Sequence, residues 1–210
     1  ESTPQTNCVI KPEGFLLVDA GSHYQYGTTD VTRTLVCGAL TAQQKEVYTL
    51  VLKGMIAVAV ADFDSQTPSA HIDALAREAL KKHGYHYGHG TGHGVGTVLS
   101  VHERGARLSP LNLKPLQVGM VLSDEPGCYL PGQFGVRIEN MVTVQQQASG
   151  KMAFKTLTMI PLDCRAIEVA LLNRQEVEWI NAYHRLILSK VKSVLTSNEY
   201  SWLKSYVYEL

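Results

Sequence analysis

"GMVLSDEPGCYLPGQFGVRIENMVTV" (residues 119–144) has the pattern of a hairpin in which two apolar strands flank the turn residues PGQFG. A turn centred on Gly132 places Glu125 directly opposite Glu139, with Cβ atoms about 5 Å apart. Like charges that face each other destabilise a sheet, and a cation between them removes that cost. The alternative is that both glutamates are surface charges at strand ends, or that the register is shifted by one residue. We expect the two strands over 119–130 and 136–144.

A second hairpin with a similar arrangement of acidic residues is predicted near the beginning of the chain. The apolar run "GFLLVDAG" (14–21) and the β-branched run "TTDVTRTLVCG" (28–38) are joined by the polar residues "SHYQYG". A turn centred within this polar link places Asp19 opposite Asp30. Surface charges explain either hairpin alone as well as a metal site does, but two such hairpins in one chain favour metal binding.

The stretch "HGTGHGVG" (89–96) carries two histidines four residues apart, a spacing that on a helix would put both on one face, as in helical zinc sites. Each of its alternating glycines costs a helix about 1 kcal/mol relative to alanine, so we expect an extended segment. Alternate residues then share a face, and the glycines allow a neighbouring backbone to approach closely. The shared face carries His89, Thr91, His93 and Val95. We expect His102, in "SVHE", to enter the same cleft. The alternative is a glycine-rich loop with solvent-facing histidines.

Helices and a loop account for much of the remaining sequence. The predicted helices cover 41–63, 69–84 and a segment that begins near Asn173. Their predicted boundaries are Thr41 as N-cap with Gln44 in a weak capping box, Ser69 as N-cap and Gly84 as stop. We expect a loop from the glycine-rich stretch to about residue 118. The sequence shows no repeat, low-complexity tract or interdomain linker.

Composition is that of an ordinary globular protein and excludes several function classes. Of 210 residues, 45% are hydrophobic and 18% charged, with 19 basic and 19 acidic residues. This balance argues against binding to nucleic acid or an anionic membrane, and no apolar run reaches the ~18 residues of a membrane span. The first residues lack a signal peptide and an initiator Met, so we expect a fragment of a longer protein. Buried free thiols in a reducing compartment are expected for Cys8, Cys37, Cys128 and Cys164.

The candidate ligands are rich in oxygen, with four carboxylates and one imidazole. Four buried carboxylates without cations would be costly or protonated, whereas two divalent cations would neutralise them. A set with one nitrogen donor fits Mn²⁺, or an ion of similar hardness, better than a structural zinc site, which prefers Cys and His. Two cations about 3.5–4 Å apart form a centre that activates water for hydrolysis of amides and phosphates. No D-x-D-x-D-G loop supports a structural calcium site.

Several motifs, in this order along the chain, resemble the catalytic domain of the metallopeptidases with the pita-bread fold. They are "LLVDAG", "GTTDVTRT", "HGTGHGVG", "VHE", "SDEPGCY" and "FGVRIENMV". This family includes methionine aminopeptidases, prolidases and Xaa-Pro aminopeptidases, and "LTMIPLD" and "EWINAYH" look like the aminopeptidase P branch. The resemblance covers nearly the whole chain. It implies an α+β pita-bread fold, and hydrolysis of the bond between an N-terminal residue and a following proline by a hydroxide that bridges two metal ions.

The resemblance also implies roles for individual residues. The metal ligands would be Asp19, Asp30, His93, Glu125 and Glu139. Glu125 would also help to deprotonate the attacking water, and His89 and His102 would line the substrate site. Arg137, two residues before Glu139, would contact the carboxylates from the same strand face; the alternative for Arg137 is a salt bridge at the rim. The implied cofactor is a pair of divalent ions, Mn²⁺ first, with Zn²⁺ or Co²⁺ as alternatives.

Part of the family's catalytic domain would be absent from this chain. The first half of the pita-bread domain, the N-terminal domains and a substrate-contacting histidine would all precede residue 1. We therefore expect residues 1–210 to be a partial catalytic domain with which the missing half is associated. For the whole protein the resemblance implies peptide substrates with proline at the second position, a homodimer and a cytoplasmic location. Two alternatives stay open, a prolidase that takes only dipeptides and a truncated pita-bread module that serves only in binding.

Overall fold

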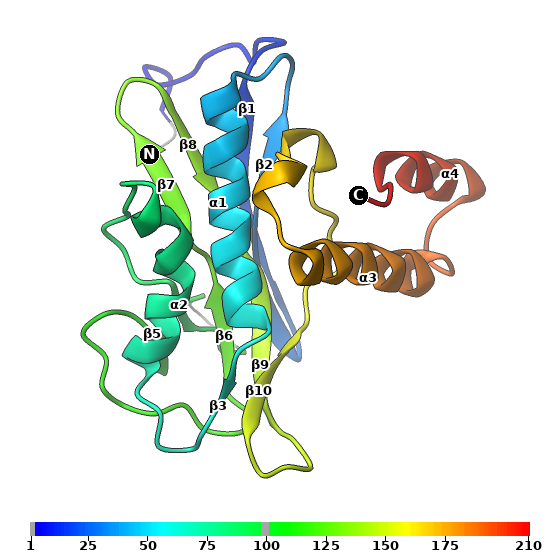
Figure 1. Ribbon diagram of the computed structural model, residues 1–210. Helices are drawn as coiled ribbons and strands as arrows, with labels where there is room; N and C mark the ends of the chain where they lie inside the picture. Colours follow the sequence, from blue (N-terminus) through cyan, green and yellow to red (C-terminus); the bar gives the residue numbers. More distant parts are fainter. Residues whose placement is uncertain (1–2, 98–100) are drawn as a thin grey trace.

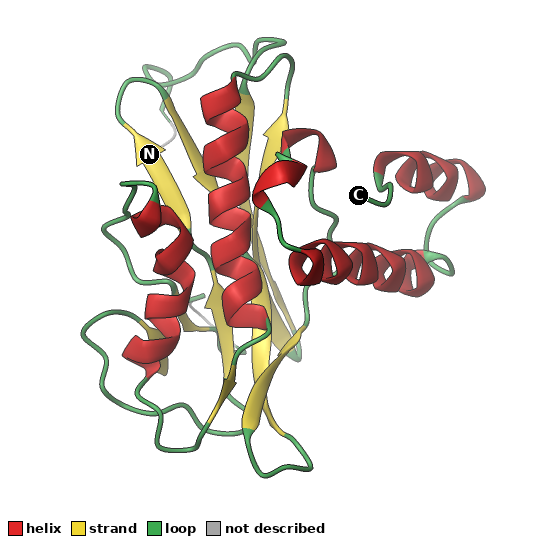
Figure 2. Cartoon of the chain, viewed as in Figure 1, coloured by secondary structure: helices red, strands yellow, loops and turns green. Residues whose placement is uncertain are grey.

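Antiparallel strands form the framework of the structure, a computed structural model that describes residues 3–97 and 101–210 (Figures 1 and 2). The strands are β1 (Phe15–Tyr24), β2 (Gly27–Val36), β3 (Asp62–Phe63), β4 (Gly92–Gly94), β5 (Glu103–Leu108), β6 (Val121–Asp124), β7 (Gly127–Leu130), β8 (Phe134–Arg137), β9 (Asn140–Gln146) and β10 (Met152–Thr156). Six of them pair in the order β3-β10-β9-β6-β4-β5, while β1 pairs with β2 and β7 with β8. Strands and helices together give the α+β class that the sequence predicts.

Four α-helices accompany the strands in the described part of the chain. They are α1 (Ala42–Ala59), α2 (Ser69–Lys82), α3 (Arg174–Val191) and α4 (Ser197–Tyr206). Helices α1 and α2 lie next to each other across the strands, whereas α3 and α4 extend to one side, beyond β2 (Figure 1). Gly54 of α1 faces the backbone of Ala76 in α2, where an added Cβ would collide with the carbonyl oxygen. The absence of a side chain at Gly54 therefore sets the close approach of these two helices.

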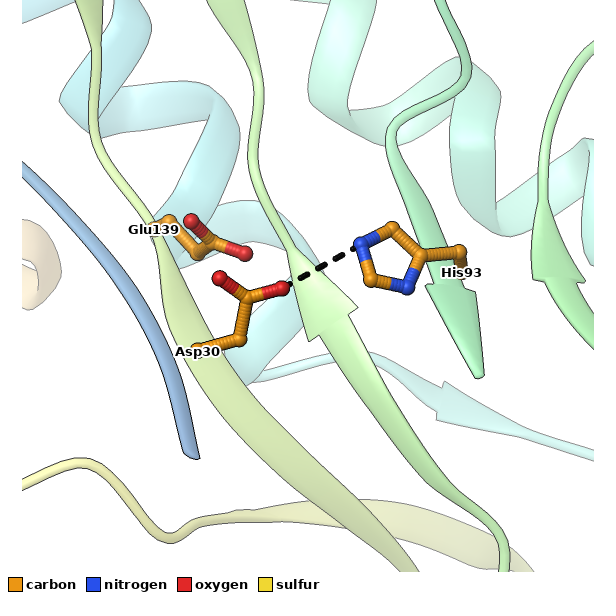
Figure 3. A group of neighbouring side chains, drawn as sticks. All are labelled: Asp30, His93 and Glu139. Carbon is orange, nitrogen blue, oxygen red and sulfur yellow. Dashed lines mark ion pairs between the residues drawn. The ribbon is translucent and has the colours of Figure 1, made fainter. Parts of the chain in front are cut away.

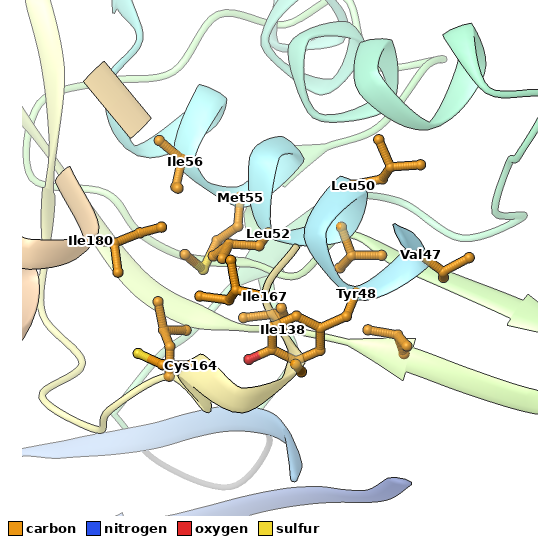
Figure 4. Close-up of a cluster of buried hydrophobic side chains, with 14 of the residues drawn as sticks. Val47, Tyr48, Leu50, Leu52, Met55, Ile56, Ile138, Cys164, Ile167 and Ile180 are labelled. Carbon is orange, nitrogen blue, oxygen red and sulfur yellow. The ribbon is translucent and has the colours of Figure 1, made fainter. Parts of the chain in front are cut away.

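Helix α1 is the centre of the larger hydrophobic core (Figure 4). Apolar residues surround it on nearly all sides, which is typical of a helix that is buried rather than amphipathic. Val47, Leu50 and Met55 are all 0% exposed, and they share the core with residues of β8 and α3. A second cluster lies beneath the six-stranded sheet and includes Leu122 and Val142 from its central strands. Strands β6 and β9, which lead into the candidate site, are thus fixed by packing on one face.

Helix boundaries follow the prediction at Thr41, near Asn173 and at Gly84, and differ at Ser69. Thr41 and Asn173 are N-caps with complete capping boxes, formed with Gln44 and Glu176 respectively. The prediction of Ser69 as N-cap is wrong, because Pro68 occupies that position and the Ser69 hydroxyl donates to Asn112 O at 3.1 Å. A positive φ of 79° at Gly84 follows the end of α2, as expected of a glycine stop.

The segments between the predicted elements contain more structure than the sequence indicates. The first helix ends at Ala59 instead of 63, because residues 62–63 form β3 and pair with β10. The loop predicted up to residue 118 includes 98–100, which lie outside the described residues, and it also contains β5, which pairs with β4. Strand β10 and helix α4 were not predicted. Strand β3 depends on a distant partner, since Phe63 pairs with Met152, and local patterns do not encode such pairing.

All four cysteines are free, but their burial differs from the prediction. Cys128 and Cys164 are buried as expected, whereas Cys37 is half-buried and Cys8 is exposed. The correction at Cys8 has a simple cause, since the chain from 3 to 13 packs little against the body of the structure and most of its residues are exposed. Among the described helices, none combines the length and the apolar character needed to cross a membrane.

Candidate metal centre

The two predicted glutamates lie where one long hairpin is interrupted. Strands β6 and β9 pair Asp124 with Asn140, and β7 and β8 continue in the same register with Gly127 opposite Arg137. The predicted register is therefore confirmed, and it places Glu125 across from Glu139 at the interruption. There the two glutamate N–H groups donate to other segments, Glu125 to Thr91 O at 2.7 Å and Glu139 to Thr32 O at 3.0 Å. The break thus joins this hairpin to the two other segments that carry candidate ligands.

The first hairpin has a different register from the one predicted. Asp19 lies opposite Thr32, and Asp30 lies opposite Gly21, because strand pairing continues to Tyr24 and the turn is one residue later than expected. A shift of two residues in pairing keeps every side chain on its face, since successive side chains alternate. Asp19 and Asp30 therefore share a face as diagonal neighbours rather than as a directly opposed pair.

Three predicted ligands converge on a single point (Figure 3). One ligand atom from each of Asp30, His93 and Glu139 lies within 4.8 Å of the others. His93 Nε2 is 3.4 Å from Asp30 Oδ2 and 3.3 Å from Glu125 Oε1, so a fourth predicted ligand joins the group. Asp19 is not part of this group. Its side chain is 49% exposed, and its carboxylate accepts a hydrogen bond from Arg137 Nη2 at 2.5 Å. The structure brings four of the five together and connects the fifth through an arginine.

Hydrogen bonds orient His93 toward the carboxylates. Its Nδ1 lies 2.9 Å from Gly94 O, and because a carbonyl only accepts, Nδ1 carries the hydrogen and Nε2 is the nitrogen that faces Asp30. Its backbone N–H donates to Ser123 Oγ at 3.0 Å, and the Ser123 hydroxyl donates to Glu125 Oε1 at 3.1 Å. At Gly92 a Cβ would collide with Ser123 O, so glycine permits β4 to lie against β6. The close approach predicted for the glycine-rich stretch is confirmed.

The extended face predicted for this stretch is correct only in part. Strand β4 covers Gly92–Gly94, and the preceding residues bend. Thr91 is fully buried and turns its hydroxyl to Asp73 Oδ1 at 2.6 Å, away from the cavity that His89 and His93 line. The prediction that Thr91 shares a face with the two histidines is therefore wrong, because a buried carboxylate on α2 draws its hydroxyl inward.

Burial and neighbouring carboxylates disfavour the ionised forms of Glu139 and Glu125. Glu139 is 1% exposed, and burial together with the charges of Glu125, Asp30 and Asp19 raises its pKa to about 8, despite a hydrogen bond from Thr32 that lowers it. Burial likewise raises the pKa of Glu125, against the opposing effect of His93. Negative charges this close together and this well shielded from water need neutralisation, so the arrangement of carboxylates fits a bound cation.

Asp124 adds to this concentration of carboxylates and was not foreseen. It is 0% exposed, and neither carboxylate oxygen has a hydrogen-bond partner among the described residues. Burial, followed by repulsion from Glu139 and Glu125, raises its pKa well above the ordinary value. Asp124 alternates with Glu125 along the strand, so it faces away from the candidate ligands.

Arg137 contacts the predicted ligands from the side, as its spacing indicates. Besides Asp19, it donates through Nη1 to Tyr129 OH at 3.1 Å and through Nε to Thr32 Oγ1 at 3.2 Å. Burial lowers its pKa, but Tyr129 and Asp19 more than compensate, so the pKa is raised and the guanidinium stays charged. Thr32 also donates to Glu139 Oε2 at 2.6 Å. Both Thr32 and Tyr129 were missed, although each lies an even number of residues from a predicted ligand and so shares its strand face.

The predicted non-ligand histidines line a cavity of about 710 Å³ beside these residues. Its wall includes His89, His93, His102, Glu125, Tyr129 and Arg137. His89 Nε2 is 2.9 Å from Tyr129 OH, and burial lowers the pKa of His89 with help from the charge of Arg137. The ring of His102 lies 4.2 Å from that of His93, centroid to centroid. Both histidines are thus beside the candidate ligands and within reach of a molecule in the cavity.

Family models cover almost the whole chain. The model of metallopeptidase family M24 matches residues 2–146, and that of the C-terminal region of the same peptidases matches residues 150–210. The chain therefore belongs to metallopeptidase family M24.

Individual relatives indicate a particular branch of this family. Probable Xaa-Pro aminopeptidase P of Paracoccidioides brasiliensis (strain Pb03) is 44% identical over 94% of this chain, and aminopeptidase P2 of Arabidopsis thaliana is 39% identical over 95%. The alignments cover 34% and 30% of those relatives, so the chain spans about a third of their length.

Solved structures give the same result. X-prolyl aminopeptidase from Caenorhabditis elegans, described as a cytosolic enzyme with a di-nuclear active site, matches with a TM-score of 0.87 and 36% identity, over 92% of this chain and 33% of that one. Prolidase from Pyrococcus furiosus matches with a TM-score of 0.61 and 33% identity, over 69% of this chain and 41% of that one. The resemblance and the pita-bread fold predicted from the motifs are confirmed.

Proposed function

We propose that the protein containing this chain hydrolyses the peptide bond between an N-terminal residue and a following proline. The observation that carries the proposal is the convergence of Asp30, His93 and Glu139, with Glu125 in contact, beside a cavity that two further histidines line. Relatives that are Xaa-Pro aminopeptidases support this substrate class. Because the chain spans about a third of those relatives, the activity is proposed for the whole protein, to which residues 1–210 contribute a partial catalytic domain.

The proposed cofactor is a pair of divalent cations held by Asp19, Asp30, His93, Glu125 and Glu139. Four carboxylates and one imidazole favour Mn²⁺, with Zn²⁺ and Co²⁺ as alternatives, and the raised pKa of Glu139 supports a cation there. When bound, such cations polarise a carbonyl oxygen and lower the pKa of a water molecule. For Asp19 to become a ligand, its carboxylate must share or exchange its contact with Arg137.

The remaining residues of the site have tasks set by the proline nitrogen. This nitrogen carries no hydrogen in the peptide bond, so it must receive a proton when it leaves. Glu125 borders the cavity and can pass a proton from the attacking water toward the leaving group, directly or through His102. His89, which Tyr129 holds through its Nε2, orients the substrate within the cavity. Arg137 keeps the carboxylates in place by binding Asp19 and Thr32.

Hydrolysis by the intact protein tests the proposal. With Mn²⁺ present, we expect cleavage of an Xaa-Pro-Xaa tripeptide and none of the matched Xaa-Ala-Xaa peptide. Glu125→Gln, which keeps an oxygen but cannot carry the proton, is expected to abolish turnover, whereas Glu78→Gln on the exposed side of α2 is expected to leave it unchanged. Cleavage restricted to Xaa-Pro dipeptides would favour a prolidase, to which the Pyrococcus match also points. Metal binding without any turnover would favour a binding module.

The proposal includes the assembly of the whole protein. We propose a cytoplasmic homodimer that acts on peptides and binds neither nucleic acid nor membrane, and an upstream half-domain that packs against this chain. An apolar side chain supports the last point, since Val18 on β1 is 40% exposed. Light scattering of the intact protein tests the dimer, and a monomeric mass would contradict it.

A further inference from the structure

Residues 87–91 lie in the connection between α2 and β4 and lead directly to His93, and they share one side-chain hydrogen bond, between Tyr87 OH and Thr91 Oγ1 at 2.6 Å. Two of the five are glycines without side chains, and regular strand pairing begins only at Gly92. A segment of this kind has many accessible conformations. Its geometry must therefore come from contacts with other parts of the structure.

Arg77 of α2 supplies two of these contacts. Its Nη1 donates to Tyr87 O at 2.8 Å and its Nη2 donates to His89 O at 2.6 Å. The guanidinium also lies over the ring of Tyr87, 3.9 Å from the centroid. One planar group thus donates to two carbonyls of alternate residues and stacks on a ring, a combination that the compact ammonium of a lysine does not provide.

Asp73, one turn earlier on α2, supplies the next two. Its Oδ1 accepts from the backbone N–H of Thr91 at 3.2 Å and from the Thr91 hydroxyl at 2.6 Å. The carboxylate also forms a bidentate ion pair with Arg77, at 2.7 and 3.0 Å, with the Asp73 side chain 1% exposed. The carbonyl of the same Thr91 accepts from the N–H of Glu125 at 2.7 Å. Through Thr91, Asp73 is therefore linked to Glu125 by two successive hydrogen bonds. The same Thr91 precedes His93 by two residues.

We propose that Asp73 and Arg77, named here the α2 ion pair, are positioning residues of the candidate metal centre. They hold residues 87–91 so that His93 and Glu125 keep the spacing that a cation requires. This inference rests on the proposed function, because it assumes that a cation binds there. Partners of metal ligands that lie outside the coordination sphere commonly change metal affinity by 10- to 100-fold.

Stability alone is a poor explanation for an ion pair whose Asp73 side chain is 1% exposed and whose Arg77 side chain is 21% exposed. Desolvation of two charges is costly, and replacing such a pair with apolar residues of similar volume is often neutral or stabilising. An apolar pair would pack α2 against the sheet equally well, but it would leave the peptide groups of Tyr87, His89 and Thr91 without these partners. The pair is explained by the bonds it makes to the segment.

A double variant, Asp73→Leu with Arg77→Met, tests the inference in the intact protein. Isothermal titration calorimetry with Mn²⁺ and urea unfolding of the metal-free protein are the two measurements. We expect the Kd for Mn²⁺ to rise 10- to 100-fold in a protein that still folds, with a lower urea midpoint because the buried Thr91 loses hydrogen-bond partners. The matched control is Glu78→Gln with Lys82→Met, which removes an exposed ion pair of the same i,i+4 spacing on the same helix and is expected to change neither value.

Arg77→Lys keeps the inference testable if the double variant does not fold. It retains the charge beside Asp73 but loses the paired contact with the two carbonyls. We therefore expect the Kd for Mn²⁺ to rise at least threefold while the urea midpoint stays at the parent's value. An unchanged Kd in the folded double variant would overturn the inference while leaving the proposed function intact. If the double variant does not fold, an unchanged Kd in Arg77→Lys would have the same meaning. A parent protein that binds no Mn²⁺ would instead overturn the proposed function, and the inference with it.

Discussion

Thr32→Val should weaken the candidate metal centre without disturbing the fold. The Thr32 side chain is 0% exposed, and its hydroxyl donates to Glu139 Oε2 at 2.6 Å. Valine has nearly the same shape but no donor, so the buried carboxylate loses a charge-assisted hydrogen bond. Hydrogen bonds to charged groups contribute about 1.5–3 kcal/mol. The bond also exists without metal, so at 1.4 kcal/mol for each tenfold change the Kd for Mn²⁺ is expected to rise by at most roughly 10- to 150-fold.

Calorimetric titration of the metal-free protein with Mn²⁺ measures this effect. Thr34→Val is the matched control, because Thr34 is 1% exposed on the same strand but its hydroxyl exchanges hydrogen bonds with the backbone of Arg137 rather than with a carboxylate. The control is expected to change the Kd by less than threefold. A Kd for Thr32→Val within twofold of the parent, or an equal loss in both variants, would refute the reasoning.

Three further predictions concern pH, the cavity histidines and the extent of the chain. Burial, with the charge of Arg33, lowers the pKa of His184 to about 4, so between pH 6.5 and 4 the unfolded chain binds more protons than the folded one. The free energy of unfolding should therefore fall by about 3 kcal/mol as the pH is lowered over that range. Urea titrations of His184→Gln should show a smaller fall, and an identical fall would contradict the assignment. His89→Ala and His102→Ala should each lower kcat/KM by about 100-fold with metal content unchanged, and loss of metal in either would show that a ligand was misassigned. Residues 1–210 expressed alone should have little or no peptidase activity with Mn²⁺, because they span about a third of the related peptidases and leave Val18 of β1 exposed where further chain would pack. Turnover near that of the intact protein would disprove this.

Much of the arrangement was predictable because the decisive information is local. The turn around Gly132 fixes the register of the second hairpin, and that register places Glu125 across from Glu139. The first hairpin lacks such a marker, so polar residues that belong to the strands were assigned to the turn and the register was two residues off. The shared face of Asp19 and Asp30 survived this error because a two-residue shift preserves alternation.

The parts that sequence reasoning missed depend on contacts between distant segments. Thr91 was expected to face the cavity, but its orientation is set by Asp73 on a helix 18 residues away. Thr32 and Tyr129 become visible as supporting residues only when the hairpins are placed together. The contact between Arg137 and Asp19, which stays a predicted ligand, likewise becomes visible only in the assembled fold. Hydrogen bonds of this kind follow from the packing of the whole fold and have no periodic signal in the sequence.

Diffraction from crystals of the intact protein grown with Mn²⁺, recorded at the manganese absorption edge, would locate the metal ions. We expect two anomalous peaks within about 2.0–2.3 Å of ligand atoms from Asp19, Asp30, His93, Glu125 and Glu139. His93 should bind through Nε2, and Asp19 should have shifted its carboxylate from Arg137 toward one of the ions. Manganese bound elsewhere, with no peak among Asp30, His93 and Glu139, would contradict this expectation.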